Sequence, residues 1–212
     1  MSFRDATLAE FLERAASDAP TPGGGALAAV GGALGAAMVA MTARLTLGRP
    51  RYADVQDAAA ELARAADTAW RALLDLADAD AAAYERVMAA LRLPRGTEAE
   101  RATRQAALQQ ALVAATQVPA AIAEQCQQVL DLAETAAAIT NRNALGDVAT
   151  GAFLAEAGMR AAAVQAELNL ASIRDVDFTA SMAAALAPRS AGAAERLDAI
   201  LATVRRRAQE GT

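Results

Sequence analysis

Histidine is missing from this 212-residue chain, and so is lysine, because all 20 basic residues are arginine. Without an imidazole the chain cannot build a histidine metal site, a Ser-His catalytic triad or a histidine general base. Proton transfer would therefore use Asp, Glu, Tyr, Cys or water. The formal net charge is -5, so no basic excess is available to neutralise phosphates, and we expect no nucleic-acid partner.

Cysteine occurs once, at Cys126, which excludes a disulfide within the chain. No basic-then-apolar leader opens the sequence, so we expect a cytoplasmic protein. Cys126 lies in an apolar helical segment without a nearby cation, which predicts a buried, unreactive thiol. Residues 26–43 carry no charge but are mostly Ala and Gly, which predicts a buried central helix rather than a membrane span.

Aromatic residues are scarce, at 3%, while hydrophobic residues reach 55%. Alanine supplies most of this apolar content, and it has the highest helix propensity. No segment alternates like a strand, so we predict an all-α fold: a single domain over residues 1–212, built as an up-and-down antiparallel bundle of long helices. Gly31, Gly32 and Gly35 would let a neighbouring helix approach closely, or a symmetry mate in a homodimer.

Capping residues and helix breakers divide the chain. Thr7 with Glu10, and Thr97 with Glu100, have the spacing of capping boxes, so helices should begin there. Pro119 should kink or split the helix that follows Thr97. The expected helices span about residues 7–19, 26–43, 54–91, 98–139, 147–170, 179–186 and 191–207.

The segment Pro20–Gly25, with the sequence Pro-Thr-Pro-Gly-Gly-Gly, is a loop that leads directly into a helix. The N-H groups of Gly23, Gly24 and Gly25 can face an anion at this helix N-terminus. The segment matches neither a phosphate loop nor a dinucleotide fingerprint. By itself it therefore indicates a loop and not a particular ligand.

Asp80 places a carboxylate on an apolar helix face, because Leu73, Leu76, Ala83 and Val87 recur around it at helical spacings. Burying an unpaired charge is costly, so Asp80 should meet an arginine, a donor or a ligand, or have a raised pKa. A structural ion pair within the bundle and a functional carboxylate both fit this pattern.

Three further polar groups are open to two interpretations. Asn141, Asn143 and Asp147 combine amides with a carboxylate, as suits recognition of a polar heterocycle, but Asp147 also fits a helix N-cap.

Arg49 and Arg51 flank Pro50 and precede Tyr52, offering guanidinium forks for a carboxylate beside an aromatic ring. Solvated surface arginines are the alternative. Asn169, near the end of an alanine-rich helix, fits either a buried polar group or a helix C-cap.

Five segments, in this order and spacing, resemble the C-terminal domain of formiminotransferase-cyclodeaminases and its free-standing cyclohydrolase relatives: Pro20–Gly25, Leu45–Tyr52, Asp78–Asp80, Asn141–Asp147 and Leu168–Asp175. With smaller similarities they span residues 7–186. The chain departs from the family pattern at Ala26, where relatives usually have Ser, and at Gln165, where they have Asn. Arg49 and Arg51 stand where relatives have Lys, which keeps the charge.

The resemblance implies a homodimeric helical bundle that acts on a tetrahydrofolate carrying a one-carbon group, with no metal and no cofactor besides this substrate. Two reactions fit. The first is hydrolysis of 5,10-methenyltetrahydrofolate to 10-formyltetrahydrofolate, which we favour because nothing in this chain would make the substrate of the second. The second is loss of ammonia from 5-formiminotetrahydrofolate. A non-catalytic dimeric scaffold or folate-binding remnant is a third alternative, with Asp80 paired internally and the glycine loop lining no cavity.

The resemblance also implies roles for individual residues. Asp80 would be the acid-base or cation-stabilising group, and Asp147 with Asn143 would hold the pterin or assist catalysis. The remaining expected substrate contacts are Arg49 and Arg51 at the glutamate tail, Tyr52 at the aminobenzoyl ring, and the loop and helix residues Thr21, Gly23, Gly24, Gly25 and Asn169.

Overall fold

The computed structural model describes residues 2–210, apart from the side chain of Ser190, and this part of the chain is helical without strands. This confirms the all-α prediction. Short 3-10 helices cover Phe3–Asp5, Pro50–Val55 and Arg142–Ala144. The six α-helices are α1 (Leu8–Ala15), α2 (Gly24–Arg44), α3 (Gln56–Arg92), α4 (Glu98–Ile139), α5 (Leu145–Leu170) and α6 (Val176–Gln209).

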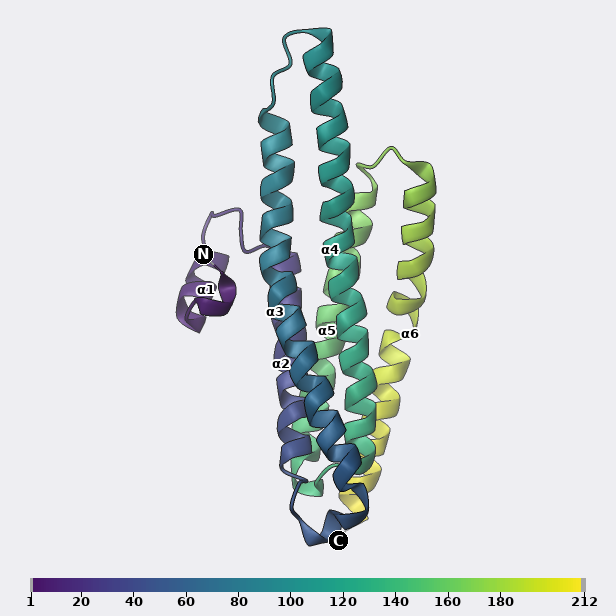
Figure 1. Ribbon diagram of the computed structural model, residues 1–212. Coiled ribbons are helices and arrows are strands. Elements are labelled where there is room, and N and C mark those ends of the chain that lie inside the picture. The colour runs from purple at the N-terminus through teal and green to yellow at the C-terminus, as the bar shows by residue number, and fades with distance from the viewer. Residues whose placement is uncertain (1, 211–212) are drawn as a thin grey trace.

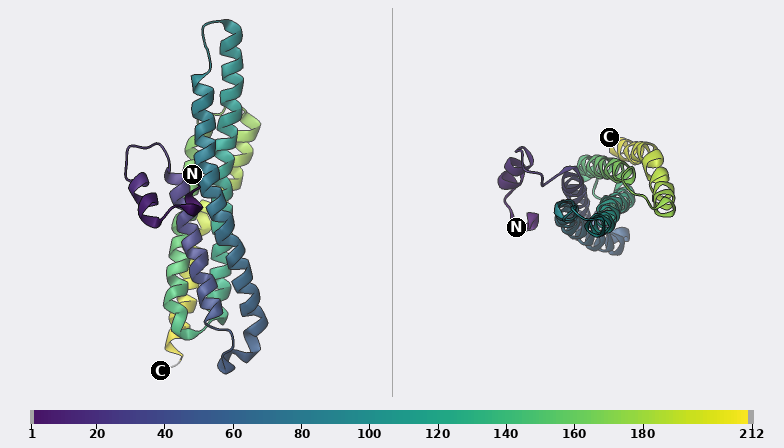
Figure 2. Two further views of the ribbon diagram at one scale, coloured as in Figure 1. Left: turned by 60° about the vertical axis from the view of Figure 1, so that its left-hand side comes forward. Right: turned by 90° about the horizontal axis from the view of Figure 1, so that it is seen from above.

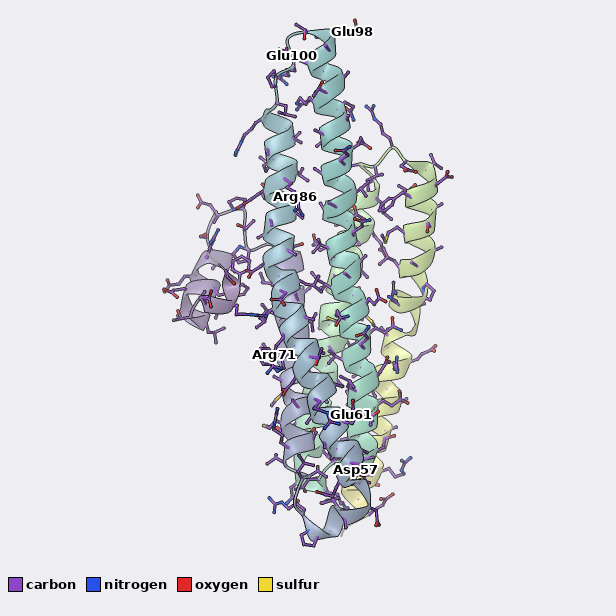
Figure 3. All side chains as sticks on the ribbon, viewed as in Figure 1. Asp57, Glu61, Arg71, Arg86, Glu98 and Glu100 are labelled. Atoms are coloured by element: carbon purple, nitrogen blue, oxygen red, sulfur yellow. The ribbon has the colours of Figure 1, made fainter. Side chains whose placement is uncertain are left out.

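Helices α2 to α5 form an up-and-down bundle, and α6 packs against α5 and α4 on one side (Figure 1). The hairpin of α3 and α4 extends beyond the other helices, with Glu98 and Glu100 at its far end (Figure 3). On the opposite side from α6, α1 stands away from the bundle beside α2 (Figure 2). We call residues 2–20, which include α1, the N-terminal arm.

Glycine and alanine bring α2 and α5 into close contact. A Cβ atom on Gly35 would lie 2.7 Å from the carbonyl oxygen of Gly151, and one on Gly158 would lie 2.7 Å from that of Ala28. Real Cβ atoms do not approach so closely, so no side chain fits at this crossing. The expected close approach of a neighbouring helix is therefore confirmed within the chain.

Cys126 fills the space that small residues leave in this crossing. Its side chain is fully buried, and burial raises the pKa of the thiol to about 12. At neutral pH the reactive thiolate is therefore not formed. The predicted buried, unreactive cysteine is confirmed.

Two predicted helix starts are confirmed, while a split at Pro119 and the predicted break near Pro188 are wrong. Thr7 and Thr97 each form a capping box with the residue three positions on. By contrast, α4 runs unbroken through Pro119, and α6 is one helix through Pro188 instead of two. A proline removes one backbone hydrogen bond, and packing along the bundle holds each helix together across that gap.

Helices α2 and α4 are long and apolar enough, by length and composition alone, to cross a membrane. In α2, however, 61% of the most apolar window is buried inside the protein. Its residues therefore form the core of the bundle, as predicted for this charge-free segment.

Candidate functional site

A cleft of about 400 Å³ lies at the N-terminus of α2, between α3, α4 and α5. This volume falls in the range of about 300–1,000 Å³ that is typical of small-molecule sites. The cleft brings together six of the predicted site residues and others that were not predicted. The polar and loop residues in its lining are Thr21, Gly23, Gly24, Gly25, Asp80, Tyr84, Gln165 and Asn169.

Asp80 presents its carboxylate to the first turn of α2. Its Oδ2 accepts a hydrogen bond of 3.0 Å from the N-H of Ala26. Helix α2 has Gly23 as its N-cap and no side-chain cap, so the positive end of the helix faces this carboxylate. Burial raises the pKa of Asp80, and the Ala26 hydrogen bond opposes this only in part.

The alternative of a structural ion pair for Asp80 is not met, because no described arginine lies within ion-pairing distance of it. The carboxylate is therefore available to a positively charged ligand. The scaffold alternative also expected the glycine loop to line no cavity, and the loop lines this cleft.

The glycines of the loop differ in how much they are needed. A Cβ atom on Gly25 would lie 2.6 Å from Cγ of Asp80, and one on Gly24 would lie 2.8 Å from Nε2 of Gln165. At Gly23 the nearest atom would be 3.9 Å away, an ordinary contact. The missing side chain at residue 25 lets the backbone press against the Asp80 carboxylate, whereas at residue 24 the contact is with the movable end of the Gln165 side chain.

Asn169 repairs a hydrogen bond that Pro119 removes. In an α-helix the carbonyl of Ala115 would accept the N-H of residue 119, but proline has none. Nδ2 of Asn169 donates instead to this carbonyl, at 2.9 Å. Because α5 ends with Ala171 as its C-cap, the C-cap alternative for Asn169 is wrong. The amide is a polar group between two helices, and it lines the cleft.

The N-terminal arm supports the loop that lines one side of the cleft. Arg14 donates from Nε to the carbonyl of Thr21 at 2.8 Å and from Nη2 to its hydroxyl at 3.2 Å. Asp78, two residues before the cleft carboxylate, accepts the N-H of Phe3 at 2.6 Å and the hydroxyl of Ser2. Arg14 of α1 thus holds the loop that carries Thr21, while Asp78 of α3 holds the beginning of the arm. The Thr21–Pro22 peptide bond in this loop is cis.

The other predicted site residues lie at the opposite end of the bundle. Helix α2 separates them from the cleft, and its 21 residues span about 30 Å. Within one chain these residues do not share a site with Asp80, because α2 begins at the cleft and ends at the opposite end of the bundle (Figure 1). A site shared between two subunits stays a prediction. These residues are Arg49, Arg51, Tyr52, Asn143 and Asp147.

At that opposite end, Tyr52 and the polar turn connect two loops. The hydroxyl of Tyr52 accepts the N-H of Arg142 at 3.0 Å. Asn141 donates from Nδ2 to the carbonyl of Leu45 at 3.1 Å, and its Oδ1 accepts the N-H of Asn143 at 3.1 Å. These contacts connect parts of the fold, and they occupy the Tyr52 hydroxyl and the Asn141 amide, which a ligand would otherwise use.

The charged residues at this end, Asp147 and the arginines Arg49 and Arg51, form no ion pair with described residues. The N-cap of α5 is Ala144, with Asp147 in the first turn, so the N-cap alternative for Asp147 is wrong. Its charge still favours the helix N-terminus. Arg49 and Arg51 are exposed and form no ion pair with described residues, in agreement with the alternative of solvated surface arginines.

Three cleft residues were not singled out as contacts by the sequence analysis: Tyr84, Pro119 and Gln165. Tyr84 follows Asp80 by four positions, and Gln165 precedes Asn169 by four. Residues four apart share a helix face. This spacing was the signal that could have found two of them.

Comparisons with known proteins agree with one another. The family model described as Formiminotransferase-cyclodeaminase matches residues 7–188. A methenyltetrahydrofolate cyclohydrolase from Methylorubrum extorquens is 39% identical over 172 residues, covering 81% of this chain and 83% of the relative. A formimidoyltransferase-cyclodeaminase from Rattus norvegicus is 33% identical over 177 residues, but the match covers only 33% of that longer protein.

A solved structure is also similar over nearly the whole chain. The crystal structure of formiminotetrahydrofolate cyclodeaminase from Thermotoga maritima aligns with a TM-score of 0.85 at 29% identity. The alignment covers 96% of this chain and 98% of that one.

Proposed function

The chain belongs to the formiminotransferase-cyclodeaminase family, and we propose that it hydrolyses 5,10-methenyltetrahydrofolate to 10-formyltetrahydrofolate in the cleft at Asp80. The observation that carries this proposal is a half-buried carboxylate without an ion-pair partner among the described residues, in a cleft of suitable volume. The relative named as a cyclohydrolase supports the choice of reaction, because its match covers most of both chains.

The substrate carries an amidinium cation across N5, the one-carbon group and N10, and the Asp80 carboxylate stabilises such a cation. A water molecule attacks the one-carbon atom, and Asp80 accepts a proton from it as the C-O bond forms. The product of this step is a neutral tetrahedral carbinol. The C-N5 bond then breaks while Asp80 returns its proton to N5 and the carbinol hydroxyl loses its proton to solvent. One proton is released overall, and the formyl group remains on N10.

Two amides facing the cleft suit the pterin ring. Asn169 uses Nδ2 for the carbonyl of Ala115 and keeps Oδ1 as an acceptor. Gln165 forms no hydrogen bond with a described residue, so both its donor and its acceptor are available. Convergent polar groups in a mostly apolar cleft are typical of sites that fix the orientation of a heterocycle.

The direct test follows the near-ultraviolet absorbance of 5,10-methenyltetrahydrofolate with purified protein and with the Asp80→Asn variant. We expect enzyme-dependent loss of absorbance, reduced about 10²- to 10⁴-fold in the variant. Circular dichroism checks that the variant keeps its helices. Near-normal turnover by folded Asp80→Asn would refute the assignment of Asp80.

The second candidate is cyclodeamination of 5-formiminotetrahydrofolate, which the similarity to the Thermotoga maritima structure favours. Here N10 attacks the carbon of the protonated formimino group, and Asp80 accepts the proton that N10 loses. Asp80 then passes this proton to the amino group, the C-N bond breaks, and ammonia leaves as the methenyl cation forms. Ammonia release from the formimino substrate measures this reaction. If it is fast while methenyl hydrolysis is absent, the second candidate replaces the first.

The proposed enzyme is a homodimer that pairs the outer faces of α2 and α5. We call this surface the apolar face; it exposes Leu27, Leu34, Phe153 and Val164, each at least 43% accessible. Large apolar side chains exposed on two neighbouring helices in this way are typical of interfaces.

Charge favours an antiparallel pairing of the two copies. Acidic residues, among them Glu13 and Asp18, precede the start of α2, while Arg49 and Arg51 follow its end. A two-fold axis across the middle of α2 sets the acidic end of one copy beside the basic end of the other. In such a dimer the arginines that follow α2 in one copy lie near the cleft of the other copy. We also propose a single domain over residues 1–212 and a cytoplasmic location, and the lone, buried Cys126 supports the location.

A further inference from the structure

A second hollow of about 340 Å³ adjoins the cleft. The two share Pro20, Thr21 and Tyr84 in their linings. On its far side the second hollow is lined by Glu85, Met88 and Arg92. A ligand in the cleft can therefore extend past Tyr84 into a region with different chemistry.

One helix supplies a chemically ordered row of side chains along both hollows. Asp80, Tyr84, Met88 and Arg92 follow one another on α3 at intervals of four residues, so they form a slowly turning stripe. Along this stripe a carboxylate is followed by an aromatic ring, a thioether and a guanidinium. Asp80 and Arg92 are about 18 Å apart along the helix axis, at 1.5 Å per residue.

Arg92 is free to bind an anion. It is the last residue of α3, is exposed, and forms no hydrogen bond or ion pair with a described residue. Among the described residues that line the two hollows it is the one arginine. A guanidinium of this kind suits a carboxylate, which it can bind through two parallel N-H groups.

We propose that the second hollow binds the aminobenzoyl-glutamate tail of the substrate, with Tyr84 and Met88 along the aromatic ring and Arg92 paired with a tail carboxylate. This rests on the proposed function, because it takes a folate as the ligand of the cleft. The order of groups on α3 then matches the substrate: the cationic one-carbon centre at Asp80, the ring at Tyr84 and Met88, and the anionic tail at Arg92.

This assignment differs from the one that the sequence suggested, in which Arg49 and Arg51 meet the tail. Those residues lie about 30 Å from the cleft of their own chain, at the other end of α2. They could reach a cleft only in a partner subunit. Arg92 needs no partner.

The test compares Arg92→Gln with wild type on two substrates: 5,10-methenyltetrahydrofolate and the corresponding tetrahydropteroate, which lacks the glutamate. We expect the variant to raise KM for the full substrate about tenfold with kcat nearly unchanged, because the lost contact is remote from the reacting atoms. On the truncated substrate, variant and wild type should be equal. Arg86→Gln is the matched control, because Arg86 is also an exposed arginine of α3 but lines neither hollow (Figure 3).

Two results would overturn the proposal. An equal loss on both substrates would mean that Arg92 acts through the fold or the chemistry. If Arg92→Gln leaves KM unchanged while Arg49→Gln or Arg51→Gln raises it, the tail binds instead at the end of a partner subunit that carries those two arginines.

Equilibrium binding separates this proposal from the proposed reaction. Calorimetric titration with 5-formyltetrahydrofolate needs no turnover. The affinity it measures therefore includes the tail contact even if Asp80 does not act as inferred. Weaker binding by Arg92→Gln than by wild type and Arg86→Gln supports the tail hollow. Equal binding, or no binding to wild type, overturns it.

Discussion

The carboxylate of Asp80 is destabilised by burial and stabilised by the N-H of Ala26, and burial has the larger effect on its pKa. As the base of the proposed reaction it must be ionised. The acidic limb of the kcat/KM profile should therefore lie at higher pH than for an ordinary, solvated aspartate.

The same pKa shift predicts a gain in stability for Asp80→Asn at pH 8. Because the pKa of Asp80 is raised in the native state, native protein binds the proton more tightly than unfolded protein. The free energy of unfolding therefore falls as pH rises from the ordinary pKa through the raised one, and the deficit persists above it. A neutral Asn avoids this deficit.

Urea unfolding of wild type and Asp80→Asn at several pH values measures this effect. The variant should unfold at higher urea at pH 8, and the difference should shrink toward the lowest pH at which both stay folded. A variant less stable than wild type at pH 8 would mean that the lost charge at the α2 N-terminus outweighs desolvation.

Gly25 should be indispensable for activity, while Gly23 should not. A methyl group at residue 25 would displace the Asp80 carboxylate, whereas one at residue 23 would make only ordinary contacts. We expect Gly25→Ala to lower kcat/KM at least about 100-fold, because a displacement of 1 Å in a reacting group has an effect of that size. Gly23→Ala is the control and should stay within a few-fold of wild type; equal losses in both would show that the loop conformation, rather than contact with Asp80, is what matters.

The sequence predicted Asp80 because a carboxylate interrupts an apolar helix face. For Tyr84 the signal was weaker: it follows Asp80 by four positions, but an aromatic residue on that helix face usually belongs to the core. Arg49 and Arg51 were predicted from their local sequence and from the family resemblance of that segment. Local chemistry carries no information on distance, and 21 residues of straight helix place them far from Asp80.

Among the helices, α4 depends on α5 at one backbone position. The carbonyl of Ala115 is left without its helical partner by Pro119, and Asn169 supplies the donor. Asn169→Ala should therefore cost about 1–3 kcal/mol of unfolding free energy, the range for a buried group left unsatisfied. Water entering the cleft would bring the value to the low end.

A double-mutant cycle tests this explanation. In a Pro119→Ala background the new N-H of residue 119 can bond to the carbonyl of Ala115, so Asn169→Ala should then cost less than in wild type. Chemical unfolding of the four proteins gives the coupling energy. Identical costs in both backgrounds would show that Asn169 stabilises the protein through some other contact.

Helix starts were more predictable than helix ends. Capping boxes at Thr7 and Thr97 are local and were found from their spacing. Whether Pro119 or Pro188 breaks a helix depends on what packs beside it, such as the amide of Asn169 beside α4. That partner lies 54 residues away in sequence, so no local pattern contains it.

At the scale of the whole molecule, the apolar face should hold two copies together. Leu34 is 52% exposed at the middle of α2, where an antiparallel two-fold axis would pass. Leu34→Glu would then place two like charges near each other in a desolvated contact and should convert dimer to monomer at micromolar concentration. Sedimentation equilibrium measures the mass.

Leu91→Glu serves as the control, because Leu91 is 40% exposed on the α3 extension, away from the apolar face. It should leave the mass unchanged. A wild-type protein that is already monomeric at these concentrations would contradict the dimer, and a dimer unaffected by Leu34→Glu would move the interface elsewhere.

The docking of the N-terminal arm has a practical consequence for anyone producing this protein. Ser2 and Phe3 are tied to Asp78, and through Arg14 the arm also supports Thr21 in the wall of the cleft. An affinity tag fused ahead of Ser2 would disturb these hydrogen bonds to Asp78. It would thereby loosen the loop at Thr21, which lines the cleft about twenty residues further along the chain. Affinity tags belong at the carboxyl end, because α6 ends at Gln209, at the end of the bundle farthest from the tip of the α3–α4 hairpin (Figure 1). Kinetic constants from amino-terminally tagged protein should be compared with those of protein from which the tag has been cleaved.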